Sequence, residues 1–284
     1  MTDKIYAGIV LYNPDSKRLV ENVVAIASQV DKVILYDNGS KNIEKIECDT
    51  NLMQQCKLIK SPKNCGIASA LNKLASFAYN DGAKWLLTLD QDTVVKLGLI
   101  DTYRKYMNLP QIGQLCCLFE DRNNPKMKLT NFAEVEKVDR TITSAALVNL
   151  LAWKDVGGFD ESLFIDYVDH DFCAALIHHG YFNYQINYIG FLHELGHTER
   201  HSFLWWSYAT TNHNAFRRYY MARNCILVAR RYHTSVWREC KWLLEETARI
   251  ILAEKDKRKK ITNTFKGIKD GLTIDATRPM RYVK

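Results

Sequence analysis

Trp85–Thr93, WLLTLDQDT, is the stretch from which the organisation of the whole chain can be worked out. It opens with an almost wholly apolar run, which is typical of a strand buried on both faces. The run ends at Asp90 and Asp92. Side chains two positions apart in a strand point the same way, so both carboxylates could converge on one cation, and oxygen ligands suit Mg²⁺ or Mn²⁺. The alternative is a polar turn in which Asp92 caps a helix over Val95–Met107.

Strand and helix patterns alternate before this stretch. Strands are predicted at Lys4–Leu11, Lys32–Tyr36 and Cys56–Ile59, and helices at Leu19–Val30 and Ile67–Tyr79. This alternation predicts βαβ units and a mostly parallel sheet, in which ligands bind beyond the carboxyl ends of the strands. Polar clusters stand at those ends: Tyr12-Asn13, Asp37-Asn38, Asn64–Gly66 and Asp90–Asp92. They predict a nucleotide pocket. The chain has neither GxGxxG after the first strand nor GxxxxGK[ST], which argues against a dinucleotide fold and a P-loop.

The second half of the chain holds a further acidic segment. Strands are predicted at Ile112–Phe119, Thr141–Val148 and Tyr181–Phe191. Between the last two lies LFIDYVDHDFC, Leu163–Cys173, with three aspartates among apolar residues. Acids in such surroundings suggest at least one buried, functional carboxylate. Capping and dipole compensation at a helix start is the alternative for the others.

HELGH, His193–His197, matches the HExxH pattern of zinc proteases. We give this match little weight because the segment follows a strand-like run and Gly196 interrupts any helix. A loop histidine that touches a phosphate or a metal is the favoured interpretation. A histidine that is hydrogen-bonded within the loop remains the alternative.

Composition narrows the class of protein. The 284 residues suffice for one or two domains, the start lacks a signal-peptide pattern, and no apolar run reaches the roughly 18–20 residues of a membrane span. The eight cysteines lack CxxC spacing and are predicted to be free thiols in a reducing cytoplasm. Residues 215–284 contain 18 Lys and Arg against 7 Asp and Glu, so this part is expected to meet something anionic.

Seven motifs, in order, resemble those of the GT-A-fold family 2 glycosyltransferases, and above all the bacterial rhamnosyltransferases of O-antigen and capsule assembly. The motifs are LYNPD (11–15), YDNGS (36–40), NCGIASALN (64–72), LDQDT (89–93), GGFDESLFIDYVDHDFC (157–173), HELGH (193–197) and RRYYMARN (217–224). The resemblance covers about residues 4–232. It implies a Rossmann-like α/β GT-A fold, with a mostly parallel sheet flanked by helices and a C-terminal helical extension. We expect a catalytic domain over 1–214 and a basic helical extension over 215–284.

The resemblance also implies roles for individual residues. Those expected to bind the nucleotide are Tyr12, Asn13, Asp37, Asn64, Gly66, Ala68 and Asp90. Those expected to hold Mg²⁺ or Mn²⁺ are Asp92, Asp90 and His193. Those expected near the diphosphate or the acceptor are His193, His197, Arg223 and Asn224.

The expected catalytic base is Asp169. Asp166 competes with it, because the glutamate that usually precedes the base is Val168 here. The arginine that commonly follows the cysteine of this motif is Ala175, so whatever that arginine stabilises must be held in another way.

The resemblance implies an inverting, metal-dependent transfer of a sugar, with dTDP-rhamnose as the leading donor. A UDP-sugar-dependent hexosyl- or galactofuranosyltransferase is the runner-up. The expected acceptor is a saccharide or a polyprenyl-diphosphate-linked saccharide, and the basic helices would then lie on the inner membrane face, with a solvated cap or a homodimer contact as alternatives. A non-catalytic binder of anionic lipid or nucleic acid, or a pseudo-enzyme, also remains open, although carboxylates at the strand ends argue against nucleic acid.

Overall fold

The computed structural model describes residues 3–121, 133–193, 199–203 and 206–282. The chain divides into two compact units. Unit 1 comprises Met1–Glu161, Asp169–Glu194 and Met280–Lys284, and unit 2 comprises Ser162–Val168 and Leu195–Pro279. The domain boundary expected at 214/215 falls inside unit 2. As a functional division, it stays a prediction.

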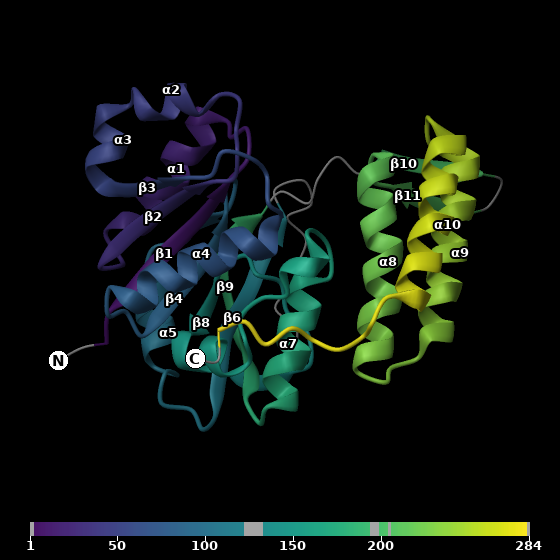
Figure 1. The fold of residues 1–284 in the computed structure, drawn as a ribbon. Helices are drawn as coiled ribbons and strands as arrows, with labels where there is room; N and C mark the ends of the chain where they lie inside the picture. Colours follow the sequence, from purple (N-terminus) through teal and green to yellow (C-terminus); the bar gives the residue numbers. More distant parts are fainter. Residues whose placement is uncertain (1–2, 122–132, 194–198, 204–205, 283–284) are drawn as a thin grey trace. The chain divides into compact units, whose positions relative to one another are not determined.

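Unit 1 is built on one sheet, to which nine of the described strands belong (Figure 1). The strands are β1 Ile5–Leu11, β2 Lys32–Asp37, β3 Cys56–Lys60, β4 Trp85–Asp90, β5 Val94–Val95, β6 Ile112–Asp121, β7 Val135–Val138, β8 Ala146–Asn149 and β9 Phe182–His193. Their order is β3-β2-β1-β4-β8-β6-β9-β5, and β7 also pairs with β9. β3, β2, β1 and β4 are parallel, and β8 alone separates β4 from the parallel pair β6 and β9. The fold is therefore α/β with a mostly parallel sheet, as expected.

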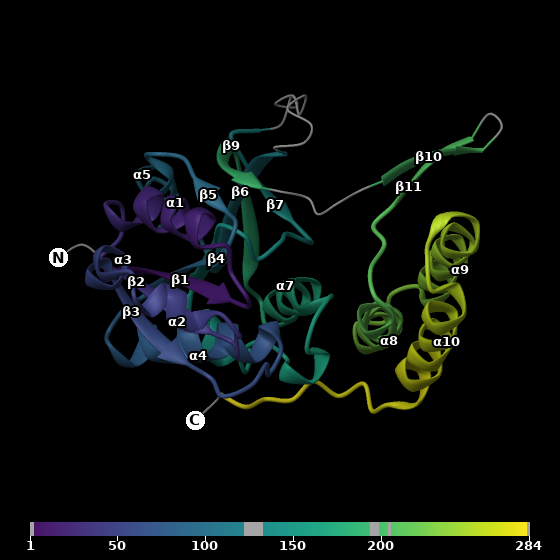
Figure 2. The ribbon, with the colours of Figure 1, turned by 90° about the horizontal axis from the view of Figure 1, so that it is seen from above.

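Helices cover both faces of this sheet. They are α1 Ser16–Ala27, α2 Ile43–Glu47, α3 Thr50–Gln55, α4 Ile67–Asn80, α5 Leu99–Arg104, α6 Leu150–Asp155 and α7 Val168–His178, with a 3₁₀ turn at Glu161–Leu163. Figure 2 shows α1 and α5 on one face and α4 on the other. Right-handed crossovers require this arrangement, because β1–α1–β2 and β3–α4–β4 step across the sheet in opposite directions. Every residue of β1 is buried, which places the central strands in the core.

The start of α5 corrects one interpretation of Asp92. The N-cap of α5 is Gly98, at φ +83°, and the short strand β5 lies between Asp92 and that helix. Asp92 therefore does not cap the helix. It does not extend β4 either, because β4 ends at Asp90 and the Thr93 N–H donates to the Asp90 carbonyl at 3.1 Å, closing a turn.

Unit 2 contains a ribbon of β10 Glu199–Phe203 and β11 Trp206–Thr210 and three helices, α8 Ala215–Arg231, α9 Val236–Ala253 and α10 Lys257–Thr273. The sequence analysis did not foresee α10. It lies against α8 through Gly267 and Gly271, where a Cβ would come within 2.3 Å of the Tyr219 carbonyl and 2.6 Å of the Arg223 carbonyl. Among the described residues, no helix has the length and apolar character needed to cross a membrane.

Candidate active site at the strand ends

The carboxyl ends of β1, β2 and β4 are neighbours in the sheet. The register pairs Leu11 with Asp37 and Val10 with Asp90. β1 lies between β2 and β4. The connection from β1 leads to β2 on one side, and the connection from β3 leads back across to β4 on the other, so the direction of the connections reverses at β1. Such a switch point is where open α/β sheets bind ligands. The structure therefore brings together three of the four polar clusters that the sequence placed at strand ends.

Hydrogen bonds fix the loops after β1 and β2 to each other. The Asn13 N–H donates to the Ser40 hydroxyl, and the Asn13 side-chain carbonyl accepts from the Lys41 N–H, both at 2.8 Å. Asp37 is buried, and its carboxylate accepts from the Ser40 N–H at 3.0 Å. Tyr12 is half exposed beside them and offers a ring face to a ligand.

The fourth cluster joins this site through the buried side chain of Asn38. The Asn38 side-chain amide donates to the Asn64 side-chain carbonyl at 3.1 Å and to the Gly66 carbonyl at 3.2 Å. Its carbonyl accepts from the Cys65 N–H at 2.9 Å. Gly66, at φ +88°, is the N-cap of α4, and Ala68 is buried in the first turn. All four clusters thus form one polar edge.

The end of β4 offers hard oxygen ligands. The Ser144 hydroxyl donates to the Asp90 carboxylate, and the buried Asn22 amide donates to the Asp90 carbonyl at 2.8 Å. Gln91 ties the turn to β1, because its side-chain carbonyl accepts from the Tyr12 N–H at 2.9 Å. Two carboxylates on a turn with these neighbours fit Mg²⁺ or Mn²⁺ in ligand chemistry. Among side chains that the structure describes, no three His, Cys, Asp or Glu residues form a metal cluster.

Asp169 begins the second acidic feature of unit 1. It lies in the first turn of α7, half buried, and its carboxylate accepts from the His170 N–H at 2.8 Å. Asp171, in the same turn, is buried. Of the three aspartates in the segment, these two share the first turn of α7.

Asn72 is a residue whose role the sequence analysis missed. It is fully buried on α4, and its amide donates to the Phe159 carbonyl at 2.8 Å and to Glu161 at 3.0 Å. Its carbonyl accepts from the Phe159 N–H and from the Trp153 indole. Asn72 is the last residue of the motif NCGIASALN (64–72), but only the fold shows that it holds residues 159–161. These residues directly precede the acidic segment Leu163–Cys173.

Asp166 belongs to unit 2, and its carboxylate is bound by an arginine side chain. Arg217, at the start of α8, forms a bidentate pair with it, at 3.2 and 2.9 Å to one carboxylate oxygen and 3.1 Å to the other. Arg217 is the partner that the sequence analysis missed. Two parallel N–H···O bonds thus hold the Asp166 carboxylate in place, and the choice between Asp169 and Asp166 as the base stays a prediction.

Arg223 and Asn224 are buried in α8 and bound to backbone carbonyls of residues 162–166. Their expected place near the diphosphate or the acceptor stays a prediction. The side chain of His193 and all of His197 lie outside the described residues, as does the HELGH match.

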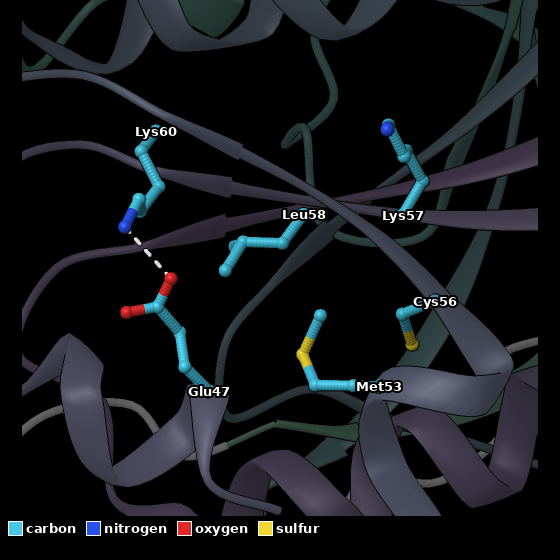
Figure 3. A pocket seen from close by; sticks show the side chains of 6 residues that line it. All are labelled: Glu47, Met53, Cys56, Lys57, Leu58 and Lys60. Atoms are coloured by element: carbon cyan, nitrogen blue, oxygen red, sulfur yellow. Dashed lines mark hydrogen bonds and ion pairs between the residues drawn. The ribbon is translucent and has the colours of Figure 1, made fainter. Parts of the chain in front are cut away.

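Surface hollows among the described residues include two that are not lined by the polar edge. One, of about 460 Å³, lies beside the edge strand β3 and is spanned by the 2.7 Å ion pair of Lys60 with Glu47 (Figure 3). The other, of about 780 Å³, is lined by residues of the α1 and α5 ends. Neither hollow is lined by a residue of the polar edge. The candidate site is therefore defined by the four polar clusters that meet at that edge.

Residues 7–126 match the family model described as glycosyl transferase family 2. The chain carries a family 2 glycosyltransferase domain. This match includes β1 to β4, and with them the polar edge and the Asp90–Asp92 turn. The protein is thus a glycosyltransferase, and the expectation drawn from the seven motifs is confirmed at this level.

The glycosyltransferase has a relative of similar length. It is 29% identical over 295 residues to the dTDP-rhamnosyl transferase RfbF of Shigella flexneri, covering 96% of this chain and 98% of that one. The fold is also that of solved structures. S. aureus TarS 1-349 in complex with UDP gives a TM-score of 0.61 at 13% identity, over 95% of this chain and 81% of that one. GalNAc-T7 with UDP, GalNAc and Mn²⁺ gives 0.62 at 12% identity, over 95% and 56%.

Proposed function

We propose that this glycosyltransferase is an inverting, metal-dependent rhamnosyltransferase that uses dTDP-rhamnose in bacterial surface polysaccharide synthesis. The observation that carries the proposal is the polar edge at the switch point of the sheet, built from Tyr12, Asp37, Asn64 and Asp90. The relationship to a dTDP-rhamnosyl transferase over nearly the whole chain supports the choice of donor.

Each part of the edge has a role in the proposed reaction. The loops around Asn13, Asp37 and Asn64 to Ala68 would bind the nucleoside. Asp90 and Asp92 would hold Mg²⁺ or Mn²⁺, with His193 as a further ligand, and the cation neutralises charge on the departing diphosphate when bound. Asp169 would accept the proton of the acceptor hydroxyl while the acceptor oxygen bonds to the anomeric carbon and the bond to the diphosphate breaks.

A UDP-sugar is the alternative donor. Thymine differs from uracil by one methyl group, worth about 1 kcal/mol in an apolar pocket, so similar residues can serve either base. The solved TarS complex with UDP-GlcNAc, of the same fold, is the reason to keep this donor in the test.

A thermal-shift screen with dTDP, UDP, GDP and CMP, each with and without Mn²⁺, tests the donor site. A ligand at about 100 times its Kd adds roughly 2.7 kcal/mol, enough to raise Tm by several degrees. We expect a Mn²⁺-dependent rise with dTDP that is absent in Asp92→Asn and preserved in Asp101→Asn, which changes an exposed aspartate of α5. No rise with any nucleotide would sink the proposal, and a larger rise with UDP would move the donor to a UDP-sugar.

We further propose that α9 and α10 contact an anionic membrane at the cytoplasmic face, where a polyprenyl-diphosphate-linked acceptor would be anchored. Trp237, Leu244 and Ile251 recur every seven residues on one face of α9 and are 77%, 62% and 52% exposed. On α10, Phe265 and Leu272 are 56% and 49% exposed, with Lys269 between them. Exposed aromatic and aliphatic side chains among lysines are typical of helices that lie in a membrane interface.

Co-sedimentation with vesicles containing phosphatidylglycerol tests this contact. We expect the wild type to pellet at low salt and a Trp237→Ser/Leu244→Ser variant to remain in solution. Leu97→Ser, at an 84% exposed leucine of unit 1, is the control and should pellet like the wild type. If the wild type stays in solution while sedimentation velocity shows a dimer that the double variant loses, this face is a homodimer contact instead.

A further inference from the structure

Residues 162–168 of unit 2 form a strained loop. Phe164, Asp166 and Tyr167 have φ angles of +64°, +61° and +63°, which non-glycine residues seldom adopt. Three such residues within four positions cost free energy that surrounding contacts must offset. Strained residues of this kind cluster at functional sites, so the side chains of this loop are candidates for a binding function.

Two buried residues of α8 hold the loop. The Asn224 amide donates to the carbonyls of Leu163, Ile165 and Asp166 at 2.8, 2.8 and 2.9 Å. The Arg223 guanidinium donates to the carbonyls of Ser162 and Leu163 at 2.5 and 3.2 Å. These bonds are made to the backbone of the loop and offset its strain.

The loop and α8 together present aromatic rings. Phe164 lies parallel to Tyr220 at 5.2 Å between ring centroids, and Phe216 meets Phe164 at 5.6 Å and Tyr220 at 4.9 Å. The Arg223 guanidinium lies over the Tyr220 ring, 4.6 Å from its centroid, in a cation–π contact. Phe216 is 53% exposed, so this cluster offers part of its surface to solvent.

Polar, planar side chains lie next to these rings. Arg217 directly follows Phe216, and Asp166 is two residues from Phe164; the two form the bidentate pair described above. His213 is in the same environment: burial, Arg217 and Arg218 lower its pKa to about 4, so its ring is neutral at pH 7. A carboxylate, a guanidinium and a neutral imidazole can all bind sugar hydroxyls, and an aromatic face can bind the C–H face of a sugar ring.

We propose that Phe216, Phe164, Tyr220 and the Asp166–Arg217 pair form a saccharide-binding surface for the acceptor. This inference rests on the proposed function, because it assigns the acceptor of that reaction to unit 2. The choice of occupant follows from the side chains: a lipid tail or an apolar peptide has no hydroxyl groups for the ion pair, whereas a saccharide offers hydroxyls to the pair and a C–H face to the rings. In the sequence, Asp166 lies three residues before the proposed base, Asp169.

Saturation-transfer NMR on the full chain, with a panel of methyl glycosides of hexoses, deoxyhexoses and N-acetylhexosamines, tests the surface. We expect saturation transfer to at least one glycoside in the wild type, about tenfold weaker binding in Phe216→Ala, and near wild-type binding in Phe216→Trp. Phe265→Ala is the matched control, because Phe265 is 56% exposed in the same unit but on α10. Arg217→Lys, which keeps the charge and loses the bidentate geometry, should also weaken binding.

Nucleotide binding, measured in parallel by the dTDP thermal shift, separates the two proposals. A wild type that binds dTDP but no glycoside, or whose glycoside binding survives Phe216→Ala, would overturn the saccharide surface and leave the proposed function standing. A wild type that binds glycosides through Phe216 but no nucleotide would support the surface and overturn the proposed function.

Discussion

The side-chain amide of Asn224 donates to the backbone carbonyl of Asp166 at 2.9 Å, although 58 residues separate them in the chain. Asn224 is fully buried, and Asp166 has a left-handed backbone. A buried residue of α8 thus holds the backbone of the loop that carries the Asp166 carboxylate. This contact relates a motif in the last third of the sequence to the aspartates of residues 163–173.

Asn224→Ala should destabilise unit 2. The substitution removes the Asn224 donor from the carbonyls of Ile165 and Asp166, while the Leu163 carbonyl keeps its bond from Arg223, and an unsatisfied buried group costs about 1–3 kcal/mol. Thermal unfolding of the full chain would measure the loss, with Asn263→Ala on α10, whose side chain is bonded only locally to the Lys259 carbonyl, as the control. Equal Tm values for the two variants would show that the loop does not depend on Asn224.

Asp169→Asn and Asp166→Asn should have different kinetic effects. Asp169→Asn removes the proposed base and should lower kcat about 10²–10⁴-fold, with the affinity for dTDP unchanged. Asp166→Asn breaks the pair with Arg217 and should raise the acceptor KM more than it lowers kcat. Steady-state kinetics with dTDP-rhamnose would decide, and a larger fall of kcat in Asp166→Asn would reassign the base.

Gly158→Ala should release the C-terminal tail from unit 1. A Cβ at Gly158 would lie 2.5 Å from the Tyr282 ring and 2.7 Å from the Asn72 carbonyl. Tyr282 is held there by its 4.8 Å ring contact with Trp153 and by a 2.9 Å hydrogen bond to Glu161.

Gly82→Ala is the matched control for the tail. Both glycines have φ near +80°, but a Cβ at Gly82 meets no atom within 4 Å. Both variants therefore bear the backbone strain of about 1–2 kcal/mol, and only Gly158→Ala should also expose the tail to carboxypeptidase. Identical digestion of the two would contradict this docking.

Glu254→Gln should change the acid stability of unit 2. Glu254 is buried between Arg218, at 2.6 Å, and Lys260, at 2.8 Å. Burial raises the pKa of Glu254, but hydrogen bonding to Lys260 and the charge of Arg218 outweigh burial and lower it below the usual range. The stabilisation is therefore complete above the ordinary glutamate pKa and is lost as the pH falls through the lowered value.

The substitution should cost about 3–5 kcal/mol at pH 7, because it removes the anion from the buried Lys260 and leaves the buried Arg218 paired with Glu246, at 2.8 Å. The difference from the wild type should shrink below about pH 4. Urea unfolding at several pH values would measure it, with the exposed Glu245→Gln of α9 as control. A difference that does not vary with pH would exclude this ionic origin.

Much of unit 1 could be predicted because its signals are local. The apolar runs of β1, β2 and β4 and the periodicity of α1 and α4 each lie within about a dozen residues. The short strands β5 and β7 and the helices α2 and α3 were missed because segments of two to six residues carry little periodicity. α10 was missed because its start falls in the charge run Glu254–Lys260 and because its packing on α8 depends on glycines, which by themselves argue against a helix.

The sequence by itself determined which polar residues stand at the strand ends. A buried parallel strand must be apolar, so polar side chains directly after such a run are evident from the sequence and indicate a function. Only the tertiary structure decided their partners. Asn22 reaches Asp90, Asn72 reaches Glu161 and Arg217 reaches Asp166 across 68, 89 and 51 residues. Such contacts follow from how strands and helices pack, and no local pattern specifies them. Hence the sequence named Asp169 as the expected base with Asp166 as its competitor, and only the fold showed that Asp166 is paired with an arginine.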